Sequence, residues 1–250
     1  MSKLVLICMS SLIVQAAALL CDNLSLSDDL PCTEVPRCNG QQYAHITVDQ
    51  LSNGYGDSKS YSDISLCFDD DRLYVNHVAH KQVFLTPTSY TQCNDPVFNS
   101  NVGEFFVAPY MESEPHCYNE LDISPFNVMF DAGIYNPNLN RSGIVGSEFE
   151  CSSSGITNSV VQDSENETWS ASMSFPFSLL NCPFNCPLKQ YCGHSTPNNI
   201  YRANFFRINE LVETASCTSS TCEYMAWSPT MVDPPAFHEP TKFGYLLLQL

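Results

Sequence analysis

The chain has few positive charges. Only 10 of its 250 residues are lysine or arginine, against 27 aspartates and glutamates, which gives a formal net charge of −17 at pH 7. A protein this acidic repels the phosphate backbone of nucleic acids and the anionic surface of bilayers. The composition therefore excludes nucleic acid as a partner and leaves neutral or cationic ligands, including uncharged polymers.

The sequence also lacks a hydrophobic run suited to a membrane-spanning helix, which needs roughly 20 apolar residues. The run that comes nearest to this length is at the start of the chain. In residues 1–18, Lys3 is followed by LVLICMSSLIV, and the segment ends in three alanines. This order is typical of a secretory signal peptide cleaved near Ala18. We therefore predict a secreted, extracellular protein without membrane insertion. Its parts are a signal peptide (1–18), a cysteine-rich N-terminal arm (19–42) and one body (43–250); the oligomeric state is left open.

No signature of a common catalytic or nucleotide-binding site is present. The chain has no P-loop, no dinucleotide-binding fingerprint and no recognisable Ser-His-Asp arrangement. Tryptophan is scarce, with 2 residues beside 15 phenylalanines and 12 tyrosines. One of them, Trp227, precedes a loop dense in proline, and such a loop stays at the rim of a sheet. We predict a rim aromatic residue there; a core tryptophan at a strand end is the alternative.

Cysteine, in contrast, is abundant, with 13 copies. Cys8 lies in the predicted signal peptide, and the even number that remains in an exported chain indicates up to six disulfides. We expect all of these to be oxidised: Cys21, Cys32, Cys38, Cys67, Cys93, Cys117, Cys151, Cys182, Cys186, Cys192, Cys217 and Cys222.

The order of the cysteines leaves their pairing open. Cys217 and Cys222 can close a hairpin. Three others are close enough in sequence for a compact loop: Cys182, Cys186 and Cys192. With His194 nearby, the same group can be drawn as a zinc site, which an oxidising compartment disfavours.

Three Asn-x-Ser/Thr sequons occur, at Asn23, Asn140 and Asn166. In a protein exported from a eukaryotic cell these asparagines are acceptors for N-glycosylation. We therefore expect all three on surface loops.

Short segments of alternating apolar and polar residues recur along residues 43–250, separated by turn residues. The segments with this pattern are YAHITV, DISLCF, RLYVNHVA, QVFLTP, GEFFVAPY, YNELDIS, FNVMFDAGIY, Val160-Val161, TWSASMSFPF, IYRANFFRINEL and the closing residues 243–250. About nine or ten strands are expected among them. Only residues 177–180 suggest a short helical turn. The fold class that follows is all-β, a disulfide-rich antiparallel β-sandwich of jelly-roll or immunoglobulin-like type. Its predicted core is Ile64, Leu66, Phe68, Leu73, Val75, Phe105, Val107, Leu121, Ile123, Phe175, Phe205, Leu246 and Leu248.

Two segments invite a metal-binding interpretation that their spacing does not support. Asp69, Asp70 and Asp71 lack the glycine and distal glutamate of a hand-type calcium loop, so a solvated turn is favoured. His77 and His80 are three residues apart on an expected strand, which puts them on opposite faces. We interpret both histidines as ordinary strand residues.

Four segments taken together resemble the carbohydrate-binding module family 9-like domain of the DOMON-type sandwiches. They are DISLCFDDDRLYV, NDPVFNSNVGEFFVAPY, CYNELDISPFNVMFDAGIY, and YRANFFRI followed by YMAWSPT and AFHEPTKFGYLLL. Their order covers residues 41–250, and the last pair is the most specific. The resemblance implies a β-sandwich that holds sugar rings between two aromatic side chains.

Carried onto this chain, the resemblance implies that Phe98 and Trp227 are the two aromatic plates. It places the strand glutamate of the sugar site at Glu104 and the strand arginines at Arg202 and Arg207. The apolar face of a pyranose stacks on an aromatic ring, while carboxylate and guanidinium groups bind its hydroxyls. We expect Trp227 beside Phe98 at one rim, with Glu104 and Arg202 reaching the same concavity.

The chain departs from the family pattern at three positions. Phe98 replaces the usual tryptophan, Asn101 stands where an acidic residue is expected, and Gly103 replaces the usual valine before Glu104. These departures favour weak affinity or a repurposed site.

The leading prediction is a secreted, non-catalytic protein that binds a polysaccharide or glycan. A disulfide-rich extracellular structural or interaction protein that has lost sugar binding is the alternative. A glycoside hydrolase is a third interpretation, because it would need a carboxylate pair and the chain offers Glu112, Glu114, Glu120 and Asp122.

No cofactor is predicted. A haem-binding relative would need axial ligands; Met111, Met129 and His77 exist, but no haem motif singles them out. Structural calcium, which some members of the resembled family hold, is not located by the sequence.

Overall fold

The computed structural model describes residues 21–23, 29–40, 42–187 and 196–250. The predicted signal peptide, Cys192 and His194 lie outside these residues. Nearly all regular structure is β, as expected from the short alternating segments. The strands are β1 (Cys32–Val35), β2 (Ala44–Leu51), β3 (Asp57–Phe68), β4 (Arg72–His80), β5 (Val102–Pro109), β6 (Cys117–Ile123), β7 (Met129–Tyr135), β8 (Val145–Glu148), β9 (Thr157–Asp163), β10 (Thr168–Pro176), β11 (Ile200–Glu210), β12 (Cys222–Ala226) and β13 (Gly244–Leu248). Short helical turns are η1 (Cys21–Asn23), η2 (Val97–Asn99), η4 (Pro240–Lys242) and α1 (Phe177–Leu180), the last at the predicted position.

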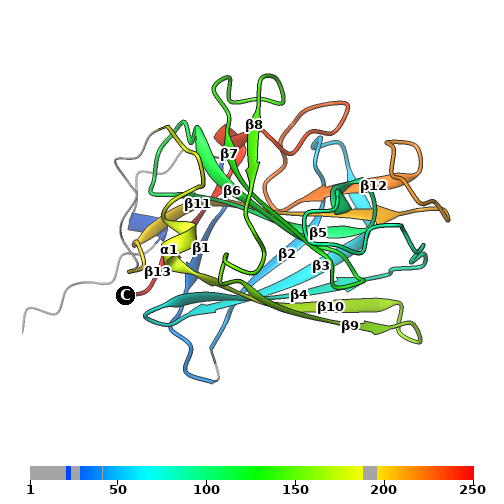
Figure 1. The fold of residues 1–250 in the computed structure, drawn as a ribbon, viewed down its shortest axis with the longest axis horizontal. Helices are drawn as coiled ribbons and strands as arrows, with labels where there is room; N and C mark the ends of the chain where they lie inside the picture. The colour runs from blue at the N-terminus through cyan, green and yellow to red at the C-terminus, as the bar shows by residue number, and fades with distance from the viewer. Residues whose placement is uncertain (1–20, 24–28, 41, 188–195) are drawn as a thin grey trace, which may run out of the picture.

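The strands form one 13-stranded sheet that curls on itself. Neighbours along its main path are β8-β7-β6-β5-β11-β12-β2-β3-β4-β10-β9, while β13 pairs with β11 and β1 pairs with β13. In Figure 1 the half from β8 to β11 lies over the half from β2 to β9, so one curled sheet supplies both layers. The predicted all-β sandwich is confirmed, with a single parallel pairing among the named strands, between β1 and β13.

The main core lies between the two halves of the curled sheet. Every core residue predicted from strand alternation is buried there. Phe105 of β5 stacks on Phe205 of β11, with ring centroids 4.7 Å apart and planes 9° apart. It also contacts Phe175 of β10 at 5.5 Å, across the sandwich. Burial of these large aromatic side chains supplies much of the hydrophobic stabilisation.

Two segments of the body differ from the regular strand pattern. Residues 82–87, QVFLTP, do not form a strand, because the Phe84 carbonyl accepts side-chain hydrogen bonds from Gln82 and Asn101 in place of a ladder. Residues 136–155, rich in asparagine, serine and glycine, contain the short strand β8, which pairs with β7.

The N-terminal arm contributes more than expected. Rather than lying only on the surface, its residues 32–35 form β1, and Val35 is fully buried in the main core. The arm is fixed by disulfides Cys21–Cys32 and Cys38–Cys67, the second of which joins it to β3.

Disulfides tie the rest of the body. The pairs are Cys93–Cys151, Cys117–Cys186 and Cys217–Cys222, and Cys182 is also disulfide-bonded. The predicted hairpin closed by Cys217 and Cys222 is confirmed. The compact loop expected to include Cys186 is wrong, because Cys186 bonds Cys117 on β6. A zinc site using Cys182 and Cys186 is excluded by the same bonds, since a zinc ligand must be a free thiolate.

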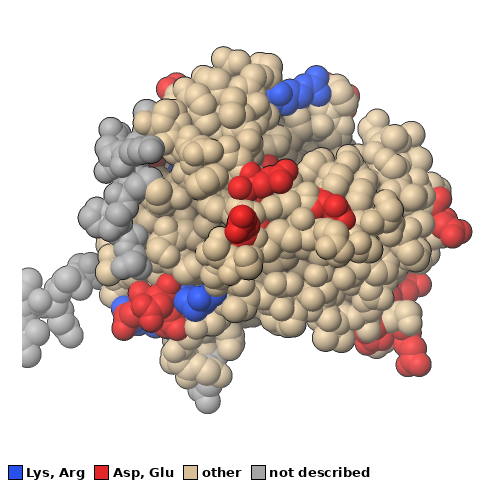
Figure 2. All heavy atoms as spheres, in the orientation of Figure 1, with Lys and Arg blue, Asp and Glu red and all other residues tan. Residues whose placement is uncertain are grey.

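The surface agrees with the charge composition. On the face shown in Figure 2, acidic side chains are scattered among neutral ones and basic side chains are few. Asp69 accepts hydrogen bonds from the backbone of Asp71 and Arg72, so the acidic segment is a turn. In the part of the chain that the structure describes, no helix is long and apolar enough to cross a bilayer. Of the sequons, Asn166 is exposed and Asn140 is half-buried.

Candidate functional site

A pocket opens on the face of β5, β6, β7, β11 and β12 that points away from the main core. Its volume is about 420 Å³. Below we call it the aromatic pocket. Its lining comes from η2, the five strands, the β7–β8 connection, β8 and the loop before β13: Phe98, Glu104, Phe106, Glu120, Phe130, Ile134, Arg141, Ile144, Gly146, Ile208, Tyr224, Pro235, Ala236, Phe237 and His238.

Two aromatic pairs flank the pocket. Phe98 of η2 meets Phe130 of β7 edge to face, with centroids 5.1 Å apart. Tyr224 of β12 lies 6.0 Å from Phe237 of the last loop. Phe237 in turn stacks on Phe206 of β11 at 4.2 Å, with planes 12° apart. Because β6, β5 and β11 separate β7 from β12, the two pairs stand on opposite sides of the sheet face.

Three carboxylates lie beneath these rings. Glu104 of β5 is directly opposite Asp122 of β6 in the strand register, and Glu120 is two residues away on the same face of β6. One carboxylate oxygen from each of the three lies within 4.8 Å of the others. All are buried, with exposed fractions of 4% for Glu104, 6% for Glu120 and 0% for Asp122. We call these residues the carboxylate cluster.

Few hydrogen bonds stabilise the buried oxygens of the carboxylate cluster. Among the described residues, Glu104 Oε1 and both Asp122 oxygens have no hydrogen-bond partner. Burial, and then the charge of Glu120, raise the pKa of Glu104 well above its usual range. Burial and the neighbouring acids raise the pKa of Asp122 in the same way. For Glu120 burial is the cause of the raised pKa.

His238 closes the pocket next to Glu120. Its Nε2 is 3.8 Å from Glu120 Oε2, and its Nδ1 shares a hydrogen bond of 2.7 Å with the Tyr118 hydroxyl. Asn136 donates to that hydroxyl and to the His238 carbonyl, which ties the last loop to β6 and β7. Burial lowers the pKa of His238 to about 4, so the imidazole is neutral at pH 7 and does not balance the carboxylate charge.

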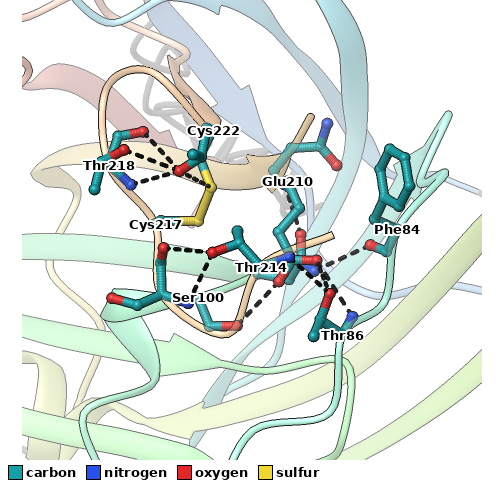
Figure 3. The surroundings of a disulfide bond; sticks show 12 residues. Phe84, Thr86, Ser100, Glu210, Thr214, Cys217, Thr218 and Cys222 are labelled. Atoms are coloured by element: carbon teal, nitrogen blue, oxygen red, sulfur yellow. Dashed lines mark hydrogen bonds between the residues drawn. A yellow bond between two sulfur atoms is a disulfide. The ribbon is translucent and has the colours of Figure 1, made fainter. Parts of the chain in front are cut away.

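The position of Phe98 is set by a disulfide-closed hairpin. The Cys217 backbone N–H donates to the Asn99 carbonyl of η2 at 2.7 Å. Figure 3 shows how the same hairpin is held at its base, where Glu210 accepts hydrogen bonds from the Thr86 backbone and hydroxyl and Thr214 donates to that hydroxyl. The turn between β11 and β12 therefore anchors the segment that carries one wall of the pocket.

Two departures from the family pattern have structural reasons. Asn101 is 1% exposed; its Oδ1 accepts from Gln82 and from the Glu210 backbone, while its Nδ2 donates to the Phe84 carbonyl. An aspartate could not make the last bond. A Cβ at Gly103 would lie 2.9 Å from Cε1 of His77, so the buried histidine occupies the space that a valine would need.

The structure brings together Phe98 and Glu104, but not the other residues of the predicted site. Trp227 does not lie beside Phe98, so that expectation is wrong. Trp227 lines a separate cavity of about 600 Å³, near Gln50 and Met231. It is half-buried and packs against the main core, with its ring 6.2 Å from that of Phe205. The reason is strand alternation: Tyr224, not Trp227, faces the pocket from β12.

The two predicted arginines are buried and do not line the aromatic pocket, so the expected position of Arg202 is wrong too. The Arg202 guanidinium donates to the carbonyls of Glu112, Thr241 and Phe243 and lies 4.6 Å over the Tyr245 ring. It fixes the loop that carries Phe237.

Arg207 has a comparable structural environment. Its guanidinium donates to the carbonyls of Tyr61 and His80 and to the side chains of Gln82 and Asn209. Burial lowers the pKa of Arg207 to about 9. Both arginines thus connect backbone segments, and a role in ligand binding stays a prediction.

The alternative catalytic and haem residues are dispersed. Glu120 and Asp122 share the pocket face, whereas Glu112 and Glu114 lie in the loop after β5. Met111 is exposed, Met129 is in the main core, and His77 is buried beside Trp169 at 4.8 Å. As expected, His77 and His80 lie on opposite faces of β4.

Sequence comparison identifies a distant relative. No known protein-family profile matches the chain. A protein of Arthroderma benhamiae, described only as an extracellular protein, is 26% identical over 186 residues, which are 71% of this chain and 75% of the relative.

Comparison with solved structures identifies the fold. A candidate carbohydrate-binding protein from Bacteroides uniformis has a TM-score of 0.65 at 15% identity, covering 88% of this chain and 99% of that chain. A carbohydrate-binding module of family 9 from Caldicellulosiruptor kristjanssonii, solved with cellotriose, has a TM-score of 0.52 at 10% identity, covering 88% of this chain and 94% of that chain. The same kind of module with glucose has a TM-score of 0.52 at 11% identity, covering 87% and 95%. The resemblance stated from sequence is therefore confirmed at the level of the fold.

Proposed function

We propose that this is a secreted, non-catalytic carbohydrate-binding protein that holds a sugar ring in the aromatic pocket. The observation that carries the proposal is the pair of aromatic walls, Phe98 with Phe130 and Tyr224 with Phe237, above buried acids. Small-molecule sites typically measure about 300–1,000 Å³ and are lined by aromatic rings with a few polar groups. The aromatic pocket fits this description.

Tyr224 and Phe237 take the place that the sequence resemblance assigned to Trp227. The apolar face of a pyranose matches an aromatic ring, and Glu104 and Glu120 reach the pocket lining as acceptors for hydroxyl groups. The neighbouring structures with cellotriose and glucose support a carbohydrate as the ligand class. The disulfides and the extracellular relative support secretion.

A binding assay on the oxidised, secreted protein tests the proposal. We expect retention on at least one glycan in an array or polysaccharide pull-down, and a loss of roughly tenfold or more in affinity for Phe98→Ala, since stacking and desolvation on one ring contribute about 1–3 kcal/mol. Tyr55→Ala is the matched control, because Tyr55 is an aromatic residue 72% exposed and outside the pocket. Absence of retention on any glycan would favour the interaction-protein alternative.

The non-catalytic part is tested separately. Incubation of the retained glycan with the protein should release no new reducing ends. Release that disappears in Glu120→Gln would instead assign a hydrolase, with the carboxylate cluster as its acid and base.

A further inference from the structure

The carboxylate cluster presents a charge problem that the sugar site alone does not solve. A carboxylate removed from water is strongly destabilising unless it is protonated, paired or bound to a metal. Here the strand register places three such groups on one face, at adjacent positions of β5 and β6. Rigid strands hold them there, so they cannot move apart to relieve the repulsion.

Among the residues that the structure describes, no lysine or arginine forms an ion pair with the cluster. Arg202 and Arg207 direct their guanidinium groups to backbone carbonyls and amide side chains elsewhere. Arg141 lines the pocket but is exposed. His238 Nε2 lies 3.8 Å from Glu120 Oε2, while its Nδ1 shares a hydrogen bond with the Tyr118 hydroxyl. Within the described part of the chain, three oxygens of Glu104 and Asp122 remain without a partner although both residues are at least nine-tenths buried.

The geometry fits a hard divalent cation. Calcium takes six to eight oxygen ligands at about 2.3–2.6 Å, so two oxygens on the same ion lie at most about 5 Å apart. One carboxylate oxygen from each residue of the cluster lies within 4.8 Å of the other two. All potential ligands are carboxylates, which favour calcium over zinc or copper, and their number exceeds the one or two that magnesium usually takes from protein.

We propose that Glu104, Glu120 and Asp122 bind a calcium ion at the floor of the aromatic pocket, and that the ion's remaining coordination positions face the ligand. Asp122, fully buried, lies on the inner side. Glu104 and Glu120 belong to the pocket lining, so the open side of the ion faces the aromatic walls. Hydroxyl oxygens of a bound sugar can then coordinate the ion directly. This second part rests on the proposed function, whereas the calcium site itself does not.

The first experiment uses calcium alone. Terbium luminescence, sensitised by the aromatic residues of the pocket, and calorimetric titration with calcium should both reveal one site, with a Kd of roughly 10⁻⁴ to 10⁻³ M, as in extracellular modules. Calcium should also raise the melting temperature. Asp122→Asn and Glu104→Gln should each weaken calcium binding by roughly tenfold or more, because ligand charge sets the affinity.

Asp131→Asn is the matched control. Asp131 is fully buried on β7 but faces the main core and not the pocket. In the strand register it pairs with Leu121 of β6, which belongs to that core. Because Asp131 acts on Asp122 only through its charge, this variant should change calcium affinity far less than Asp122→Asn or Glu104→Gln. Asp122→Asn also removes like-charge repulsion, so without calcium its melting temperature should not fall, which separates loss of the site from loss of the fold. Absence of calcium binding by the wild type, or equal binding by Asp122→Asn, would overturn the calcium site.

The second experiment removes calcium during glycan binding. A chelator should abolish retention, and calcium but not magnesium should restore it. If calcium binds but no glycan is retained, the proposed function fails and the metal site stands. If glycan is retained but calcium does not bind, the metal site fails and the proposed function stands. Retention unchanged by the chelator, with calcium binding intact, would overturn direct coordination of the ligand.

Discussion

The strands β5, β6 and β11 present two different faces. On the main-core face, Phe105, Leu121 and Phe205 pack without a polar atom among them. On the pocket face, Glu104, one residue before Phe105, and Asp122, one residue after Leu121, are buried with unpartnered oxygens near the aromatic pocket. The same strands therefore carry one face whose packing stabilises the fold and one face whose buried acids destabilise it. Groups that destabilise a fold and yet are rigidly placed are expected at functional sites.

The sharpest test of this contrast is a pair of phenylalanine truncations. Phe105→Ala should destabilise the protein by about 3–5 kcal/mol, because it leaves a cavity between Phe175 and Phe205. Phe98→Ala, on half-buried Phe98, should cost well under half of that and act on ligand binding. Thermal and denaturant unfolding measure both. Equal destabilisation would show that the two faces do not differ in the way described.

Trp227→Ala tests whether Trp227 belongs to the main core or to the ligand site. Since Trp227 packs on the main core, the variant should lose roughly 2–3 kcal/mol of stability, less than a fully buried tryptophan. Glycan retention below the melting temperature should not change. Loss of retention with unchanged melting would return Trp227 to the binding site predicted from sequence.

The hairpin closed by Cys217 and Cys222 fixes the position of η2, which carries Phe98 of the pocket face. Replacing both Cys217 and Cys222 with serine should destabilise by about 2 kcal/mol from loop-closure entropy. Because the hairpin holds η2 through Asn99, ligand affinity should fall as well. Replacing Cys21 and Cys32, a pair in the N-terminal arm, is the control: it should affect stability and leave affinity unchanged.

The last comparison varies the pH and concerns His77, the titratable group beside Gly103. Ser62 and Trp169 surround it, and Arg207 and His80 are the nearby positive or titratable groups. Burial lowers the pKa of His77 to about 3, from 6.5 in the unfolded chain. The unfolded state binds the proton first, so stability should decrease as the pH falls from 6.5 towards 3, by up to about 1.4 kcal/mol per pH unit.

The difference between the wild type and His77→Gln isolates that contribution from those of the carboxylates. Chemical denaturation between pH 7 and pH 4 measures it. A wild type and a variant with parallel stability profiles would contradict the buried, neutral state of His77.

Alternation within a strand was enough to predict the main core, because an inward position depends only on its own strand. It correctly placed Phe105, Leu121 and Phe205, for example. The strand at residues 82–87 could not be excluded in the same way, since its failure depends on side-chain hydrogen bonds from Asn101.

The pocket depends on pairings between strands that are distant in sequence. Glu104 and Asp122 become neighbours only through the register of β5 with β6. Sequence analysis identified Glu104 from the resemblance and Glu120 with Asp122 as a pair on one face, but nothing joined the two observations. Tyr224 was missed because Trp227 is the more conspicuous residue; the alternation of β12 from Cys222 to Ala226 was the available signal.

The pairing of β1 with β13 has a consequence for the order of folding. These strands come from opposite ends of the described chain, and β13 also pairs with β11. Closing so long a loop costs entropy before any contact is gained, so contacts of this kind form late and slow the folding rate. Phe237 lies in the segment that leads through η4 to β13, and Arg202 secures this segment by donating to the Thr241 and Phe243 carbonyls. During synthesis the binding surface would therefore be the last part of the protein to assemble, and an incomplete chain would have a nearly finished core but no second aromatic wall.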